Sequence, residues 1–204
     1  MSNKLGAIHS HGEAETVAPH DHGQDSANEG EEEDGAELPF GRFGNTLLAN
    51  LVAGAGFALL LGGVALLVGR RITPQNGLFW GVAGFFAAAF LPALGLSPEL
   101  PAMPAADLAQ RQLWWISTVV LSGAGIYLLV LRGEIVSKIL GLVLIIAPHL
   151  YGAPHPEDIA SPIPSLLASQ YAVASLATNL FMWAVIGLAL GWFIQAYAKS
   201  EVEG

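Results

Sequence analysis

Four histidines near the amino terminus occur in two closely spaced pairs. His9 and His11 form the first pair, and His20 and His22 flank Asp21 in the second. Neutral imidazole binds zinc, nickel and cobalt, and carboxylates help to neutralise the cation. We interpret this tract as an arm that gathers divalent metal ions weakly, because ordering a flexible chain opposes each added ligand. The alternative is a solvated tail with incidental histidines.

Two further histidines lie late in the chain, next to prolines. His149 directly follows Pro148 at the end of an apolar stretch, and His155 lies six residues further on. With Glu99 and Asp107 from an earlier loop, they could form a nitrogen and oxygen site for a divalent cation. Pro148 is expected to break its helix locally and free carbonyl groups. The alternative is an interfacial histidine bonded to the backbone beside a rigid loop.

Long apolar segments must position these side chains. Charged residues make up 12% of the 204-residue chain and hydrophobic residues 53%. The apolar stretches are close to the roughly 20 residues that a helix needs to cross hydrocarbon, and they hold almost no charge. They cover residues 44–68, 78–96, 113–131, 135–151 and 171–194. The sequence therefore predicts an all-α, polytopic membrane protein with five transmembrane helices.

The amino-terminal segment has a different composition. Residues 1–39 hold ten acidic side chains and one basic side chain, Lys4, and so carry the whole net charge of −9. Because this segment lacks periodic apolar residues, we expect residues 1–43 to form a disordered acidic tail. Residues 44–204 are then the helical membrane domain.

Basic residues in the short loops predict the orientation of this domain. Arg70, Arg71, Arg132, Lys138 and Lys199 lie in or beside the same set of alternate loops. Since cytoplasmic loops are enriched in Lys and Arg, we expect these loops and the carboxyl terminus to be cytoplasmic in a cell inner membrane. Loops 97–112 and 152–170, together with the histidine-rich tail, are expected outside.

Two internal patterns suggest how the helices pack. Residues 78–131 and 135–194 share proline and leucine spacings, which favours a repeat of two helices with transport between the repeats. Small residues also recur at helical spacing, which favours close helix packing. Uncharged amide and hydroxyl side chains inside the spans favour bonds across helices or a polar path. These residues are Gly54, Gly56, Gly62, Gly63, Gly77, Gly81, Gly187, Gly191, Asn45, Asn50, Thr178 and Asn179.

Three strings resemble the CbtA family of predicted cobalt transporter subunits. They are LPALGLSPELP at 91–101, DLAQRQLWW at 107–115 and PHLYGAPHP at 148–156, and the resemblance covers residues 38–195. It implies cobalt uptake linked to cobalamin synthesis, with a small histidine-bearing membrane subunit of the CbtB type as partner. It also implies a hydrophobic helix ahead of the acidic segment, so we expect an apolar stretch encoded upstream of Met1 and six helices in all. An immediate in-frame stop codon upstream would contradict this.

Motifs for other functions are missing from the sequence. No G-x-x-x-x-G-K-[ST] loop occurs, so a gradient, a partner or trapping of the metal must drive transport. No hydrolase or metalloprotease motif occurs, and we expect neither an enzyme nor a nucleic-acid partner, with membrane lipid as the surroundings. Imidazole and carboxylate ligands do not select cobalt over nickel or zinc. The alternatives are a non-transporting scaffold or metal-sensing subunit, and a proton or small-solute carrier that uses His149 as a relay.

Overall fold

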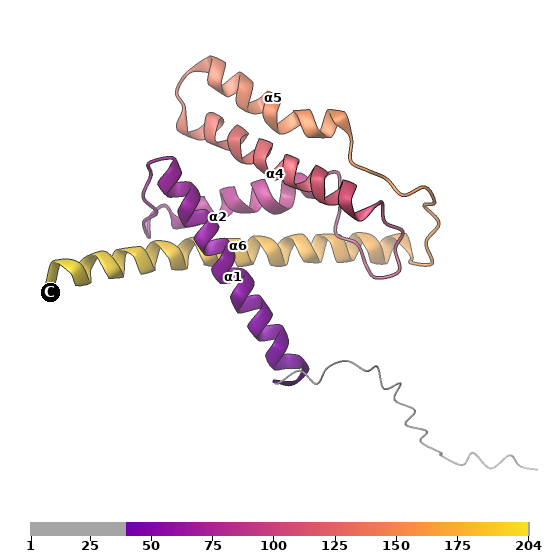
Figure 1. Ribbon diagram of the computed structural model, residues 1–204, viewed down its shortest axis with the longest axis horizontal. Helices are drawn as coiled ribbons and strands as arrows, with labels where there is room; N and C mark the ends of the chain where they lie inside the picture. Colours follow the sequence, from indigo (N-terminus) through magenta and orange to yellow (C-terminus); the bar gives the residue numbers. More distant parts are fainter. Residues whose placement is uncertain (1–39, 204) are drawn as a thin grey trace, which may run out of the picture. The chain divides into compact units, whose positions relative to one another are not determined.

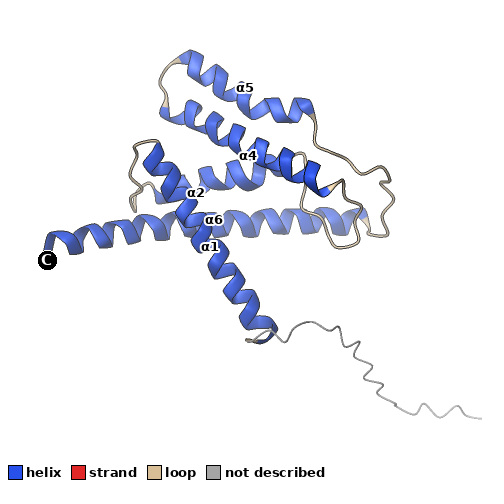
Figure 2. Ribbon diagram, in the orientation of Figure 1, coloured by secondary structure: helices blue, strands red, loops and turns tan. Residues whose placement is uncertain are grey.

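The computed structural model describes residues 40–203, and every regular element in this part of the chain is a helix (Figures 1 and 2). The elements are α1 (Gly41–Leu67), α2 (Gly77–Phe85), the π-helix η1 (Phe86–Phe90), α3 (Leu91–Ala93), α4 (Leu108–Leu131), α5 (Ile135–Tyr151) and α6 (Ser165–Glu203). Because α2, η1 and α3 follow one another without a break, they form one helical stretch. The predicted all-α class is confirmed for the described residues.

Three of the helices are long and apolar enough to cross a membrane. They are α1, α4 and the Ser165–Ser200 part of α6, whereas Gly77–Ala93 and Ile135–Tyr151 are apolar helices of at most 17 residues. A 17-residue helix is about 26 Å long, slightly shorter than the roughly 30 Å hydrocarbon core. The described structure therefore contains three candidate spans and two shorter apolar helices, and the number of five spans stays a prediction.

Two helices extend beyond the apolar stretches that predicted them. α6 has 39 residues, so it continues on both sides of the predicted stretch 171–194. α1 begins at Gly41 rather than at residue 44. The residues that follow Ile194 include Gln, Ala, Lys and Glu, which are good helix formers, so the helix has no reason to end where the hydropathy falls. Hydropathy thus predicts the part of a helix that is suited to lipid, whereas the helix propensity of the flanking residues determines where the helix begins and ends.

Glycines bring α2 and α6 into backbone contact. A Cβ atom at Gly187 would lie 2.7 Å from the backbone nitrogen of Gly81, and one at Gly191 would lie 2.5 Å from the carbonyl oxygen of Thr73. A Cβ atom at Gly77 would in turn collide with the carbonyl oxygen of Gly187. Small residues allow such an approach of two helices. The close packing predicted for these two glycine pairs is confirmed.

A second glycine contact joins α4 and α5. A Cβ atom at Gly125 would lie 2.6 Å from the carbonyl oxygen of Gly141, and one at Gly141 would lie 2.7 Å from that of Gly125. The described helices thus include two tightly packed pairs, α2 with α6 and α4 with α5. In the proposed repeat, α2 corresponds to α5 and α4 corresponds to α6, so the pair α2–α6 corresponds to the pair α5–α4. The repeat itself stays a prediction.

Among the described residues, helix α1 packs through its second half. Leu61 and Ala65 join a buried apolar cluster with Phe85, Trp183 and Ile186, where α1, α2 and α6 meet. The glycines of α1 were expected to support packing, but a Cβ atom at Gly54, Gly56 or Gly63 would meet nothing within 4 Å, and one at Gly62 would meet only Leu190, at 3.8 Å. That expectation is wrong for α1 within the described residues, because the only helix side chain that reaches these glycines is Leu190.

Polar side chains inside α1 and α6 bond to their own helices. Asn45 Nδ2 donates to the Gly41 carbonyl at 2.7 Å, Thr178 Oγ1 to Ala174 at 2.9 Å, and Asn179 Nδ2 to Ser175 at 3.1 Å. We expected such groups to bond across helices or line a path. That expectation is wrong for these three side chains, because the carbonyl four residues earlier satisfies each donor locally.

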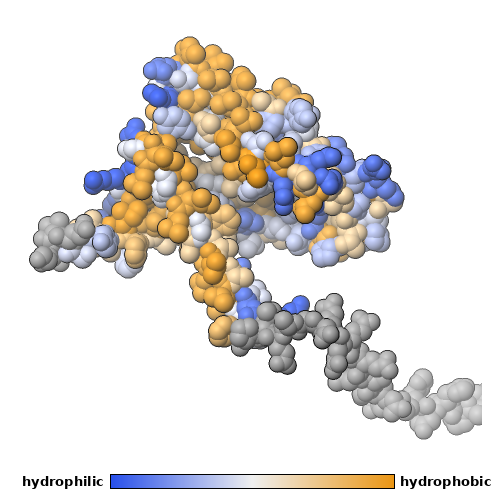
Figure 3. All heavy atoms as spheres, viewed as in Figure 1, coloured by the Kyte–Doolittle hydropathy of each residue, from blue (hydrophilic) through white to orange (hydrophobic). Residues whose placement is uncertain are grey.

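The surface of the described helices is rich in large apolar side chains. Phe43 is 83% exposed, Leu67 is 88% exposed and Phe181 is 72% exposed. Figure 3 shows hydrophobic side chains along α1, α4 and α5, with hydrophilic residues gathered in the loops. Soluble monomers rarely expose so much contiguous apolar surface. This surface, like the composition, suits a protein surrounded by lipid.

Candidate cation site

His149 lies at the end of α5, where this helix meets the start of α4. The Trp114 Nε1 group donates a hydrogen bond to the Pro148 carbonyl oxygen at 3.3 Å. The Trp114 and His149 rings make an edge contact, with centroids 5.8 Å apart and planes inclined by 70°. The Nε2 atom of His149 is buried and has no hydrogen-bond partner among the described residues. This buried nitrogen is therefore free to bind a cation when its lone pair is unprotonated.

The helix around His149 does not break at its proline. α5 continues past Pro148 to Tyr151 and ends at Gly152, whose φ of 92° favours glycine. The expected local break at Pro148 is wrong, because the helix geometry persists for three more residues. The ring of Pro148 still removes one backbone donor, which leaves the Leu144 carbonyl without its usual helical partner.

The two proline-rich loops begin next to each other at this end of the helices. A Cβ atom at Gly95 would lie 2.5 Å from the Trp114 ring and 3.0 Å from the Ala153 side chain. Gly95 follows α3, and Ala153 follows α5. The loops that start at these residues therefore share one end of the bundle, and Trp114 packs between them.

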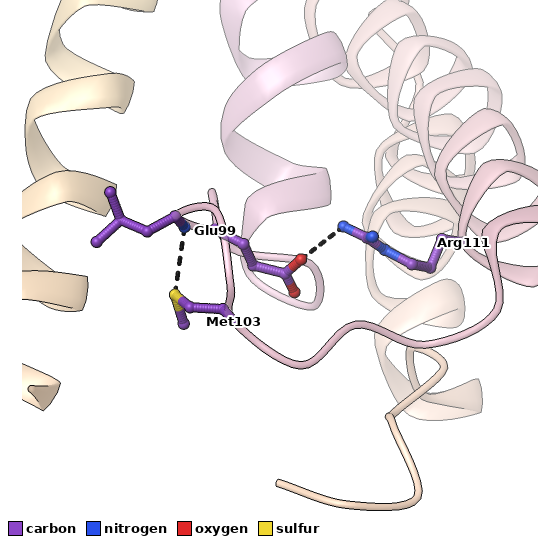
Figure 4. A network of polar contacts seen from close by, with 4 residues as sticks. Glu99, Met103 and Arg111 are labelled. Carbon is purple, nitrogen blue, oxygen red and sulfur yellow. Dashed lines mark hydrogen bonds and ion pairs between the residues drawn. The ribbon is translucent and has the colours of Figure 1, made fainter. Parts of the chain in front are cut away.

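The two carboxylates of the predicted site already have partners. Glu99 Oε2 accepts a hydrogen bond from Arg111 Nη2 at 2.8 Å, and both side chains are half-buried (Figure 4). Asp107 caps the start of α4 by accepting from the Gln110 backbone nitrogen at 3.0 Å. An N-terminal cap of this kind contributes about 1 kcal/mol to stability. The visible roles of both carboxylates are thus to hold the loop and to begin the helix.

The remaining predicted ligands do not complete a site within the described residues. His155 is exposed on the loop after α5. No three His, Asp or Glu side chains among residues 40–200 lie close enough together to hold a metal ion. His9, His11, His20 and His22 lie outside the described residues. The site formed by His149, His155, Glu99 and Asp107 stays a prediction, and in it Glu99 would have to share its carboxylate between Arg111 and the cation.

A polar stripe on α4 is a feature that our sequence reasoning missed. The fully buried residues Thr118 and Ser122 lie on the same face of α4 as Trp114 and Gly125. Thr118 Oγ1 donates to the Trp114 carbonyl at 2.8 Å, whereas Ser122 Oγ has no partner in the described part of the chain. The signal was present in the sequence, because these four residues recur every three or four positions and face one side of a helix.

The π-helix η1 packs against α4. Pro92, the second residue of α3, is fully buried. In a regular α-helix its ring would clash with the Ala88 carbonyl. The wider turn of η1 (Phe86–Phe90) avoids this clash, and π-helical turns frequently occur at functional sites. η1 contacts α4, so its backbone lies next to the helix that carries Ser122.

These groups define what the interior can do chemically. Both buried side-chain polar atoms without a partner in the described residues, His149 Nε2 and Ser122 Oγ, belong to the tightly packed α4–α5 pair. A buried donor or acceptor without a partner costs about 1–3 kcal/mol. An imidazole nitrogen and a hydroxyl oxygen are both able to bind a divalent cation or its hydration water. The arrangement therefore suits a cation that passes through rather than one held in a closed cage.

Comparison with known proteins identifies the family. The family model described as "Probable cobalt transporter subunit (CbtA)" matches residues 3–195, which is nearly the whole chain. Searches of curated proteins and of solved structures gave no significant match. The resemblance seen in the three sequence strings is confirmed by this match. The chain belongs to the CbtA family of probable cobalt transporter subunits.

Proposed function

We propose that this chain takes up a divalent transition-metal ion, cobalt in its normal role, through the interior between α4, α5 and η1. The observation that carries the proposal is the buried His149 Nε2, which has no partner among the described residues and lies at the end of the helices where both proline-rich loops begin. We choose cobalt as the ion because the family is described as probable cobalt transporter subunits. We also propose that the metal is used for cobalamin synthesis and that a small histidine-bearing membrane subunit assists the chain.

Charge asymmetry supports an outer position for His149. Gly95, which follows α3, lies beside the Trp114 ring, so the loop with Arg70 and Arg71, which precedes α2, lies at the opposite end of the stretch formed by α2, η1 and α3. Cytoplasmic loops are enriched in Lys and Arg, which favours the His149 end as the outer one. A cation would then reach His149 first and Ser122 next, and the histidines of the tail would raise its local concentration.

Reconstitution into liposomes tests this function. We expect the purified chain to load liposomes with labelled cobalt when an ion gradient is present. Weaker uptake of nickel or zinc at equal concentration would show that the geometry of the site selects the metal, because supply is then the same for all three. A chain that carries cobalt only together with a second membrane protein would favour the scaffold or sensing role. Uptake that depends on pH but ignores a chelator would favour a proton or solute carrier.

Replacement of Ser122 by alanine tests the interior path separately from entry. The change removes a buried hydroxyl that has no partner in the part of the chain that the structure describes, so we expect the melting temperature in detergent to stay the same or rise. Cobalt uptake is expected to fall several-fold, because the hydroxyl would no longer replace part of the hydration shell of the ion. The matched control is Ser117→Ala, on the exposed side of the same helix. Normal uptake by Ser122→Ala would exclude this path.

A further inference from the structure

A large open cavity lies between α1, α2 and α4, away from the polar stripe. Its volume is about 810 Å³, and its lining is apolar along most of its length, with Leu61, Phe79 and Val120 from the three helices. Three tryptophans, Trp80, Trp115 and Trp183, also line it. A cavity of this size and polarity suits a hydrocarbon chain rather than a hydrated ion.

Two arginines mark one end of this cavity. Arg70 and Arg71 line it, and both are exposed. Neither side chain forms an ion pair within residues 40–200. Arginine presents a planar fork of donors that matches the geometry of a phosphate group. Basic pockets between membrane helices on the cytoplasmic side are typical binding sites for anionic lipid headgroups.

The backbone holds these arginines in place. α1 ends at Leu67 and is followed by Gly69, which has a φ of 66°. The Gly69 and Arg70 nitrogens donate back to the carbonyl oxygens of Leu66 and Ala65 at 3.0 and 2.8 Å. These two bonds are the Schellman arrangement that ends many helices. The Asn76 side chain donates to the Arg71 carbonyl at 3.0 Å, which closes the other end of the turn. The two guanidinium groups therefore project from an ordered turn.

We infer that this cavity binds an anionic phospholipid, with an acyl chain between α1, α2 and α4 and the phosphate at Arg70 and Arg71. The inference rests on the match between two unpaired positive side chains and an adjoining apolar cavity in the described part of the chain. It is independent of the cation path, so failure of cobalt uptake in liposomes would leave it standing.

Tryptophan fluorescence provides the test, because the cavity contains three tryptophans. The full-length chain in detergent is titrated with phosphatidylglycerol or phosphatidylcholine that carries bromine on its acyl chains, a quencher of tryptophan. We expect phosphatidylglycerol to quench at about tenfold lower concentration, and the double variant Arg70→Gln, Arg71→Gln to lose that preference. Arg42→Gln, at the opposite end of α1, should keep it.

A second variant separates a cavity from simple surface charge. A Cβ atom at Gly123 would meet nothing within 4 Å, and Gly123 lines the cavity, so Gly123→Leu should fill it without disturbing the helices. We expect this variant to lose quenching by both lipids while its melting temperature is unchanged. Free glycerol phosphate should not displace the lipid, because it lacks the acyl chain.

Several results would overturn the lipid site. Equal quenching by the two lipids, or an unchanged preference in the double arginine variant, would exclude a role for Arg70 and Arg71. Displacement by glycerol phosphate alone would reduce the site to an anion site. A native mass spectrum that shows a dimer of the parent chain free of lipid would instead assign the cavity to a second copy of the protein.

Discussion

Replacement of His149 by alanine is expected to lower the initial rate of cobalt uptake at least about tenfold. Mutation of a group that only orients a metal ligand typically lowers metal affinity or activity by about 10–100-fold. Loss of the ligand itself should therefore be at least as severe. The physical reason is that His149 Nε2 is the one buried imidazole nitrogen without a partner in the described residues. The measurement is uptake of labelled cobalt, nickel and zinc by cells that express equal amounts of each variant.

Two companion variants decide what the histidine does. His149→Phe keeps an aromatic ring against Trp114 but removes both nitrogens, so the stability should be retained while uptake is lost. His155→Ala changes an exposed side chain. Loss of uptake in both His149→Ala and His155→Ala would favour the outer site with Glu99 and Asp107, whereas loss in His149→Ala alone favours the interior path. Full uptake by His149→Phe would exclude metal ligation by His149.

Replacement of Gly187 by alanine is expected to give the largest loss of stability. The added Cβ atom would collide with the carbonyl oxygen of Gly77 and would lie 2.7 Å from the nitrogen of Gly81, and neither backbone atom can move without displacing α2. Overpacking of this kind costs about 1–3 kcal/mol, and a collision with backbone is at the upper end of that range. The measurement is the thermal melting of the purified protein in detergent, with the yield of monodisperse protein beside it.

The matched control for this change is Gly63→Ala in α1. A Cβ atom at Gly63 would meet nothing within 4 Å, so the same substitution makes no clash there. Because alanine is favoured over glycine by about 1 kcal/mol inside a helix, Gly63→Ala should leave the melting temperature unchanged or raise it. Equal melting of the two variants would mean that α2 and α6 do not pack through these glycines.

The sequence predicted parts of the candidate site with unequal success. It pointed to His149 because a titratable ring next to a proline at a helix end is unusual in an apolar segment. It could not show that Glu99 pairs with Arg111 or that Asp107 caps α4, because both bonds depend on the backbone conformation of the loop between α3 and α4. Ser122 recurs at helical spacing with Trp114 and Thr118, but this spacing alone does not show which face of α4 packs against protein and which faces lipid.

What the sequence by itself determined is the class of protein. Apolar stretches of nearly membrane-spanning length force helices, because lipid cannot satisfy backbone polar groups. The family strings and the glycine pairs of α2 and α6 could also be read directly, because each is a local pattern. Only the tertiary structure decided the pairing of α2 with α6 and of α4 with α5, and with it the burial of His149 Nε2 and Ser122 Oγ. The physical reason is that burial depends on contacts between segments that are distant in the sequence. The same apolar helix sequence is compatible with a given side chain facing lipid or facing protein.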